Sequence, residues 1–153
     1  MATVKQFEDL MCWEKSRKLT RGVYKELKDC KDYGFKDQIQ RASVSVMSNI
    51  AEGFESGTKQ GFLNYLYIAK ASAGEVRAQL YIASDVGYLN IETFKFLNNL
   101  ALECSRLISS FIKKLKISEV RGLQYKHEKR EDPMKEILKI KAPEVYERFY
   151  GNK

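Results

Sequence analysis

The segment FLNYLYIAKASAGEVRAQLYIA, residues 62–83, contains the most regular apolar pattern in the chain. Its seam of apolar and small side chains, with alternating spacings of four and three, consists of Phe62, Leu66, Ala69, Ala73, Val76, Leu80 and Ala83. Such a heptad seam is typical of a helix that packs almost parallel or antiparallel to its neighbours with a left-handed twist. Thr58 is a suitable N-cap, and Gly87 is a suitable residue just past the C-terminus. The pattern therefore predicts one long helix whose alanines keep its neighbours close.

The next segment repeats this spacing after Asn90, which we expect to cap a second long helix. The seam of this helix consists of Phe94, Leu97, Ala101, Cys104, Ile108, Phe111 and Leu115. Two long helices with matched seams are expected to pack on each other. On this seam Cys104 is expected to behave as a small hydrophobic residue.

Upstream, the segment QIQRASVSVMSNIAEG, residues 38–53, predicts a helix from Phe35 or Lys36 to Glu55, ending at Ser56-Gly57. Its apolar stripe is narrow, and several of its other residues are poor interior helix formers: Ser43, Ser45, Ser48 and Asn49. Tertiary packing must outweigh that low propensity. We therefore expect neighbouring helices to approach this segment closely.

A first helix is expected from Glu8 or Asp9, whose carboxylates suit a helix N-terminus, to about Cys30. Trp13 lies on its apolar stripe, which favours a core anchor over a base-stacking side chain. The four segments predict an all-α protein, an antiparallel up-down-up-down four-helix bundle over residues 1–117. Residues 118–153 are expected to form a charged linker and a short, partly helical C-terminal tail.

Residues 38–53 resemble the signature of a four-helix-bundle family that includes the 23S rRNA intervening-sequence proteins, Q-I-R-R-A-A-V-S-I-x-S-N-I-A-E-G. Phe7, Leu10 and Trp13 are similar to the family opening F-x-x-L-x-x-W. The run after residue 61 is similar to F-x-x-x-L-x-x-A-x-x-S-x-x-E and to a closing G-Y-L. These matches span about residues 5–117. Gln40 stands where the family usually has arginine, and Gly61 where it often has glutamate.

The resemblance implies a four-helix bundle associated with nucleic acid. The family it points to comprises proteins encoded inside rRNA intervening sequences. It also includes related accessory proteins of diversity-generating retroelements, which bind nucleic acid and a reverse transcriptase. Some members form pentameric rings. A homo-oligomer, with a pentamer as one form, is therefore part of what the resemblance implies.

Composition and charge indicate the class of protein and of partner. With 44% hydrophobic and 31% charged residues in a chain of 153, the composition is that of a globular domain. A formal net charge of +7 favours polyanionic partners. The sequence has neither a signal-peptide layout nor an apolar run long enough to span a membrane, so we expect a cytoplasmic protein. Three widely spaced cysteines predict reduced thiols rather than disulfides.

Enzymatic chemistry is not expected. The one histidine, His127, lies in the charged linker, so neither a catalytic triad nor the Glu-x-x-His pairs of a di-metal bundle can be assembled within the helices. We therefore expect no catalytic residues, no cofactor and no metal. Glu52 and Glu75 are interpreted as structural partners of Arg41 or Arg77.

Nucleic-acid binding would have to use surface charge, because no phosphate-binding loop, zinc finger or RNP motif is present. Candidate residues cluster on the first helix and at the end of the fourth, with one further residue, Arg41, on the second. They are Lys15, Lys18, Lys25, Lys28, Arg41, Lys113, Lys114, Lys116 and Arg121. Phosphate contacts of this kind depend steeply on salt and are largely blind to sequence.

The helix over residues 58–87 has a second apolar and small-residue face: Tyr67, Ala71, Gly74, Ala78 and Tyr81 or Ile82. This pattern fits either a wide core-facing stripe or self-association into a ring or other homo-oligomer, and we favour self-association because a helix that is apolar on more than one side has more neighbours than one bundle core supplies. The leading hypothesis is a non-enzymatic homo-oligomer that binds nucleic acid, with RNA favoured over DNA. The alternative is a protein-interaction scaffold, for example an adaptor for a reverse transcriptase, that binds no nucleic acid.

Overall fold

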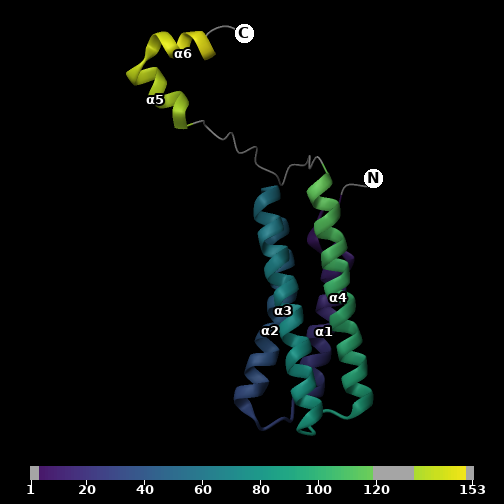
Figure 1. Ribbon diagram of the computed structural model, residues 1–153. Coiled ribbons are helices and arrows are strands. Elements are labelled where there is room, and N and C mark those ends of the chain that lie inside the picture. Colours follow the sequence, from purple (N-terminus) through teal and green to yellow (C-terminus); the bar gives the residue numbers. More distant parts are fainter. Residues whose placement is uncertain (1–3, 119–132, 151–153) are drawn as a thin grey trace.

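Four long helices form an antiparallel bundle in the computed structural model, which describes residues 4–118 and 133–150 (Figure 1). They are α1 (Met11–Glu26), α2 (Tyr33–Glu55), α3 (Lys59–Asp85) and α4 (Ile91–Ile117). Successive helices alternate in direction. Within the described residues, α1 packs on α2 and α4 but not on α3, so α1 and α3 lie on one diagonal of the bundle. The predicted all-α, up-down-up-down four-helix bundle is confirmed.

Both predicted heptad seams form the core. All seven seam residues of α3 are at most 1% exposed. On α4 five of the seven are buried, while Phe94 and Phe111 are partly buried at its two ends. Cys104 is fully buried, as its place on the seam predicts.

The predicted helix ends of α3 and α4 are also confirmed. The Thr58 hydroxyl accepts a hydrogen bond from the Gly61 N–H at 2.9 Å, and the Asn90 side chain accepts one from Thr93 at 2.8 Å. Gly87 has φ +80°, a left-handed conformation that suits a residue without Cβ. Capping therefore confines both heptads to the lengths that the sequence predicts.

Small residues on α2 allow the close packing that its composition implies. A Cβ added to Gly53 would lie 2.8 Å from both Phe62 Cδ2 and Tyr65 Cβ of α3. The hydroxyls of Ser45 on α2 and Ser72 on α3 are 2.8 Å apart. The Thr20 hydroxyl of α1 donates to the Ser43 carbonyl at 2.9 Å. The serines of α2 thus serve contacts with both of its neighbours.

Three predicted boundaries were wrong. The first helix begins at Met11 rather than at Glu8 or Asp9, because these acids lie in a separate 3₁₀ turn, Phe7–Asp9. It also ends at Glu26 instead of near Cys30. The second helix begins at Tyr33, two residues early, because Asp32 acts as its N-cap and accepts from the Phe35 N–H at 3.1 Å. The apolar periodicity indicates neither where α1 ends nor that Asp32 caps α2.

Two short helices follow, α5 (Pro133–Lys141) and α6 (Pro143–Tyr150). They pack on each other and, among the described residues, on no other helix. Most of the expected linker, residues 119–132, lies outside the described residues.

Asp32 links the two loops at one end of the bundle. Besides capping α2, its carboxylate accepts a hydrogen bond from the Tyr88 hydroxyl at 2.8 Å, and the Tyr88 ring lies 5.5 Å from that of Phe35. The Phe35 N–H, and secondarily the Tyr88 hydroxyl, lower the pKa of Asp32 from its ordinary value of 3.8. The carboxylate is therefore more acidic in the folded chain than in the unfolded one.

This shift predicts an acid-labile contribution to stability. A lowered folded-state pKa stabilises the protein above the unfolded value, and the contribution is lost as the pH falls from about 4 through the folded value. Asp32→Asn retains an N-cap side chain but does not titrate. We expect the wild-type protein to have the higher urea midpoint at pH 7, and the difference from Asp32→Asn to be smaller at pH 3. A difference that is the same at both pH values would contradict this role.

Candidate nucleic-acid interface

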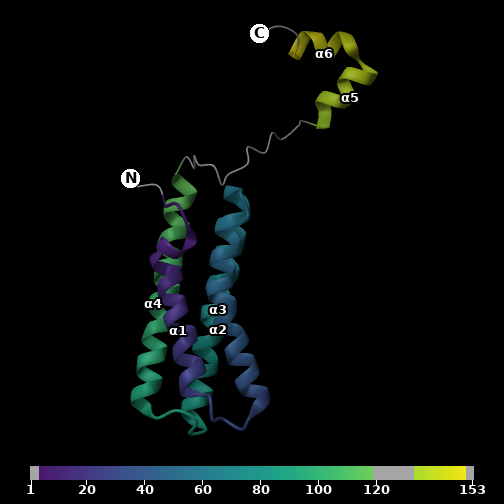
Figure 2. The ribbon, with the colours of Figure 1, turned by 180° about the vertical axis from the view of Figure 1, so that it is seen from behind.

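The outer face of α1 presents four cations. Arg17, Lys18, Arg21 and Lys25 recur at helical spacings, opposite the buried stripe of this helix, and all four are exposed. α1 lies between α2 and α4 and faces the viewer in Figure 2. We refer to these four residues as the α1 cationic face. Arg17 and Arg21 were absent from the predicted site, although their spacing from Lys18 and Lys25 indicates the same face.

Two exposed aromatic side chains flank the α1 cationic face. Phe96 of α4 is 53% exposed and Tyr24 of α1 is 46% exposed. With the four cations they line one open depression of about 840 Å³. The other residues lining it are Glu14, Thr20, Gly22 and Val44. The depression therefore combines four positive charges with one carboxylate and two accessible rings.

Close packing of α1 on α4 sets the shape of this depression. A Cβ at Gly22 would lie 2.7 Å from Leu97 Cδ2, so only glycine lets the two helices approach this closely here. Lys18 Nζ lies 5.9 Å from the centre of the Phe96 ring, a cation–π contact across the α1–α4 boundary.

Trp13 packs at the N-terminal end of the same helix. It is partly buried against the core, its ring centre is 5.1 Å from that of Phe7, and Arg17 Cζ lies 5.7 Å from its centre. The expected core role of Trp13 is supported by these contacts. Its indole Nε1 is buried without a hydrogen-bond partner.

Ion pairing separates the predicted lysines of α1 into two kinds. Lys15 Nζ lies 3.0 Å from a Glu103 carboxylate oxygen of α4, so its charge is largely compensated. Lys25 is 4.0 Å from Glu26, a distance at which an exposed pair contributes little. Lys28 is exposed just past the end of α1, and its carbonyl accepts from Lys36 Nζ at 3.3 Å. Lys18, Lys25 and Lys28 remain available to a polyanion.

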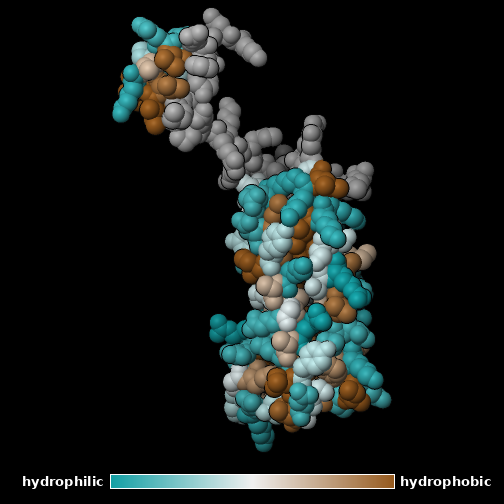
Figure 3. Space-filling view, viewed as in Figure 1, coloured by the Kyte–Doolittle hydropathy of each residue, from teal (hydrophilic) through white to brown (hydrophobic). Residues whose placement is uncertain are grey.

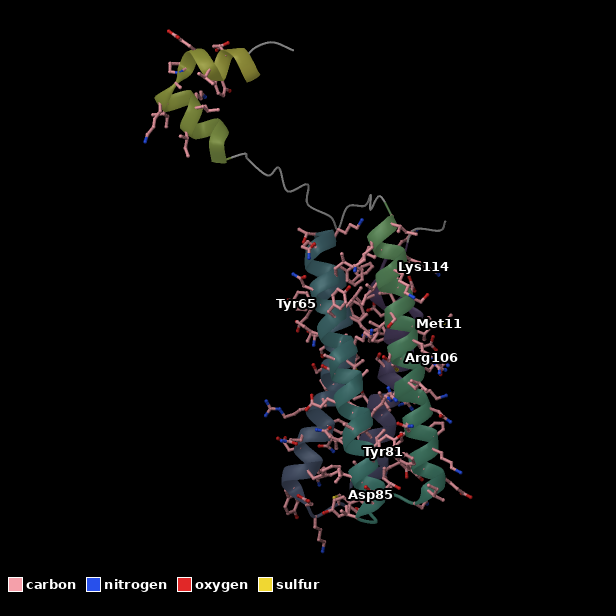
Figure 4. The ribbon with its side chains drawn as sticks, in the orientation of Figure 1. Met11, Tyr65, Tyr81, Asp85, Arg106 and Lys114 are labelled. Carbon is pink, nitrogen blue, oxygen red and sulfur yellow. The ribbon has the colours of Figure 1, made fainter. Side chains whose placement is uncertain are left out.

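The predicted lysines at the end of α4 do not share one face. Lys116 Nζ lies 5.4 Å from the Tyr67 ring of α3, whereas Lys114 lines a small depression beside Met11 and Phe111. Figure 4 shows Met11, Arg106 and Lys114 along one edge of the bundle. Lys113 is exposed as well. Arg121, also predicted, lies outside the described residues.

Lys59 adds a cation to this end that sequence reasoning missed. Its ammonium donates to the carbonyls of Lys116 and Ser118 at 3.0 and 2.8 Å, and so caps the C-terminus of α4. This contact joins residues almost sixty positions apart, so no local pattern could indicate it. The charge of Lys59 serves the fold rather than a ligand.

Arg41 has a different partner from the one expected. Its guanidinium lies 3.8 Å from Asp37, one turn earlier on α2, while Glu75 accepts from Gln79 at 3.3 Å. The predicted pairing of Glu52 or Glu75 with Arg41 or Arg77 was wrong. Arg41 and Glu75 contact nearer partners on their own helices, and no ion pair among the described residues involves Glu52 or Arg77. Arg41 shares a depression with two carboxylates, those of Asp37 and Glu75, which weakens its attraction for phosphate.

Comparison with known proteins places this bundle in a family. The sequence profile described as 23S rRNA-intervening sequence protein matches residues 8–110, about two thirds of the chain. The chain belongs to that family. The matched range covers α1, α2, α3 and most of α4. No curated protein matches the chain.

A solved structure supports the family assignment. It is a crystal structure described as a protein of unknown function from the S23 ribosomal protein family of Bacteroides thetaiotaomicron. The two chains are 28% identical with a TM-score of 0.64, and the similarity covers 67% of the present chain and 99% of the other. The bundle is thus shared, and α5 and α6 lie beyond the matched family profile.

The outer face of α3 lies across the bundle from the α1 cationic face. Tyr67, Ala71, Gly74, Ala78 and Tyr81 repeat the four-and-three spacing on the side opposite the core, and all are exposed. We refer to these five residues as the α3 outer seam. Figure 3, which views the bundle from the side of α3 and α4, shows pale and brown residues along its middle. Tyr81 lies towards the end of α3, one turn before Asp85 (Figure 4).

Buried thiols do not add a reactive site. Burial raises the pKa of both Cys12 and Cys104 to about 11, so neither is a thiolate near neutral pH. All three cysteines are free, as predicted. In the described part of the chain no three His, Cys, Asp or Glu side chains gather as a metal site would require. None of the helices in this part has the length and apolar character needed to cross a membrane.

Proposed function

We propose that this member of the 23S rRNA-intervening sequence protein family is a non-enzymatic, cytoplasmic, homo-oligomeric protein that binds RNA through the α1 cationic face. The observation that carries the proposal is the exposure of four cations on one helix face, where the depression that they line contains one carboxylate, that of Glu14. The family name, which refers to an rRNA intervening sequence, supports RNA as the polyanion.

Electrostatics sets the expected properties of this binding. Each phosphate that a lysine or arginine neutralises releases condensed counterions, so affinity falls steeply with salt and depends little on sequence. With only four cations on one helix, each protomer binds RNA weakly. Several copies of the face in one assembly would raise the overall affinity without any new contact.

The α3 outer seam supports the proposed self-association. Small residues at Ala71, Gly74 and Ala78 let a partner helix approach closely, and Tyr67 and Tyr81 are 46% and 51% exposed at its two ends. α1 and α3 occupy one diagonal, so contacts between copies through α3 leave each α1 cationic face pointing outward. A closed ring, such as a pentamer, would repeat the cationic face around one axis.

A charge-reversal experiment tests the RNA proposal. A labelled structured RNA is titrated with the full chain at increasing salt, together with Arg21→Glu/Lys25→Glu. We expect the variant to lose at least tenfold in affinity, because two phosphate contacts become repulsions. The matched control is Lys95→Glu/Arg106→Glu on α4, which makes the same change in net charge at exposed positions.

The control separates a defined face from net charge alone. Equal losses in both double variants would contradict the assignment to α1, and undetectable binding of the wild-type chain at low salt would overturn the proposal. In that last case the second candidate function, a protein scaffold that docks a partner such as a reverse transcriptase, would remain. The observation that favours the scaffold is the α3 outer seam, which is free of charged residues.

The mass of the protein in solution tests the oligomer. The Gly74 Cβ position has no heavy atom within 4 Å, so Gly74→Glu leaves the bundle core untouched. We expect wild-type protein to have the mass of several chains, and Gly74→Glu that of one or a few. A wild-type monomer would contradict the ring, and an unchanged oligomer in Gly74→Glu would exclude α3 as the interface.

A further inference from the structure

We infer that the α1 cationic face binds unpaired RNA, with bases stacking on Phe96 and Tyr24 while the cations hold the backbone. This inference rests on the proposed function and names the form of RNA that the site takes. It is carried by two exposed rings within the same depression as the four cations.

The two rings lie beside the cations, which is the arrangement that binding of a single strand requires. A single-stranded binding site combines a positive groove that follows the phosphates with aromatic faces on which bases stack. Phe96 is 53% exposed, so more than half of its surface faces solvent. Neither its position on α4 nor its contacts contribute to the core seams. Tyr24 lies on the α2 side of α1 and Phe96 on the α4 side, so the cations lie between them.

A duplex would not use these rings. In an A-form helix the bases already stack on each other, and proteins contact mainly phosphates and 2′-hydroxyls. An exposed phenyl ring beside four cations therefore gains nothing from double-stranded RNA. Unpaired bases in a loop or at an end can turn outward and cover it.

Lys18 and Gly22 make the ring accessible. Lys18 Nζ lies over Phe96 at 5.9 Å, and it can turn to a phosphate when a base takes the ring face. Gly22 lies one turn after Lys18 and lines the depression. Because it is a glycine, no side chain from this position comes between Lys18 and Phe96. At a rise of about 1.5 Å per residue, Arg17 to Lys25 spans roughly 12 Å, the length of three or four stacked nucleotides at about 3.4 Å each.

The test uses a labelled 12-nucleotide RNA without self-complementarity, alone and as a duplex with its complement. Four phosphate contacts on a single strand predict a salt slope near −3, which is about 50-fold in affinity between 50 and 200 mM salt. We expect Phe96→Ala to weaken single-strand binding at least fivefold, the lower end of what one stacked base contributes, and to leave duplex binding unchanged. Phe96→Tyr, which keeps an aromatic face, should restore it.

A matched control is available at Tyr33. This ring is 70% exposed and has Lys36 Nζ 5.1 Å from its centre, yet it does not line the depression. Tyr33→Ala should leave single-strand binding unchanged. The inference is overturned if Phe96→Ala and Tyr24→Ala leave the affinity for both single-stranded and double-stranded RNA unchanged, or weaken both equally, while salt-dependent RNA binding persists. With either result the proposed function stands. If neither RNA binds at low salt, both fail.

Discussion

Replacing Phe62 by alanine is expected to lower the free energy of unfolding by about 4 kcal/mol, because the change leaves a large cavity in the core. Phe62 is 1% exposed on the α3 seam. Its ring centre lies 5.9 Å from that of Phe54 on α2 and 5.3 Å from that of Phe111 on α4. One side chain therefore joins three helices. In a chain of this length the loss corresponds to roughly 10 °C in Tm.

Chemical denaturation of Phe62→Ala measures this loss. Phe96→Ala is the control, since it removes the same atoms from a ring that is 53% exposed, and it should cost less than about 1 kcal/mol. A Phe62→Ala loss as small as that of the control would mean that α2, α3 and α4 do not meet around this residue.

Gly53→Val is expected to destabilise the bundle by about 3 kcal/mol, at the upper end of the cost of overpacking. The first added carbon alone would lie 2.8 Å from Phe62 Cδ2 and 2.8 Å from Tyr65 Cβ. Tyr65 Cβ is attached directly to the backbone and cannot rotate away. The helices α2 and α3 must therefore separate, although valine has a higher helix propensity than glycine.

Gly74→Val provides the comparison, because the same change falls in a helix interior with no heavy atom within 4 Å. The free energy of unfolding should rise by a few tenths of a kcal/mol or stay unchanged, as helix propensity alone predicts. Because Gly74 also belongs to the α3 outer seam, thermal unfolding of the two variants is compared at a dilution at which the wild-type protein and both variants are monomeric. If both valines shift Tm equally, close approach of α2 and α3 at Gly53 is not what the glycine provides.

For α3 and α4, the apolar periodicity predicted that each helix exists, how long it is and that the two helices pack on each other. A strict alternation of four and three places the same side of a helix inward over many turns, so Phe62 to Ala83 could be assigned to the core before any contact was known. Thr58, Asn90 and Gly87 were predictable for a different reason. Their side chains, or the lack of one, meet local backbone requirements.

The N-terminal boundaries were less predictable. Glu8 and Asp9 suit a helix start by charge, yet they lie in a 3₁₀ turn, and the helix begins after Leu10, a buried residue. Asp32 was not predicted to cap a helix. Its two roles, as cap of α2 and acceptor from Tyr88, join loops separated by 56 residues. Such a contact leaves no local signal in the sequence.

The candidate interface was predictable in part. Lys18 and Lys25 belong to it, and a stricter use of helical spacing would have added Arg17 and Arg21. Lys15 could not be separated from them by spacing, because its charge is compensated by Glu103 on α4. Phe96 could not be linked to them either, since it reaches the depression from another helix.

Local order along the chain was enough to establish four helices, their seams and their main caps, because heptad spacing and capping act over a few residues of one segment. Which cations stay free, which rings border them, and which seam of α3 is left without a partner depended on the folded arrangement. Those properties arise where different helices meet: Glu103 reaches Lys15, Lys59 reaches the end of α4, and Gly22 lets α1 approach Leu97. The charge compensation and the exposure of a residue depend on all of its neighbours in space, and the local sequence does not identify those neighbours.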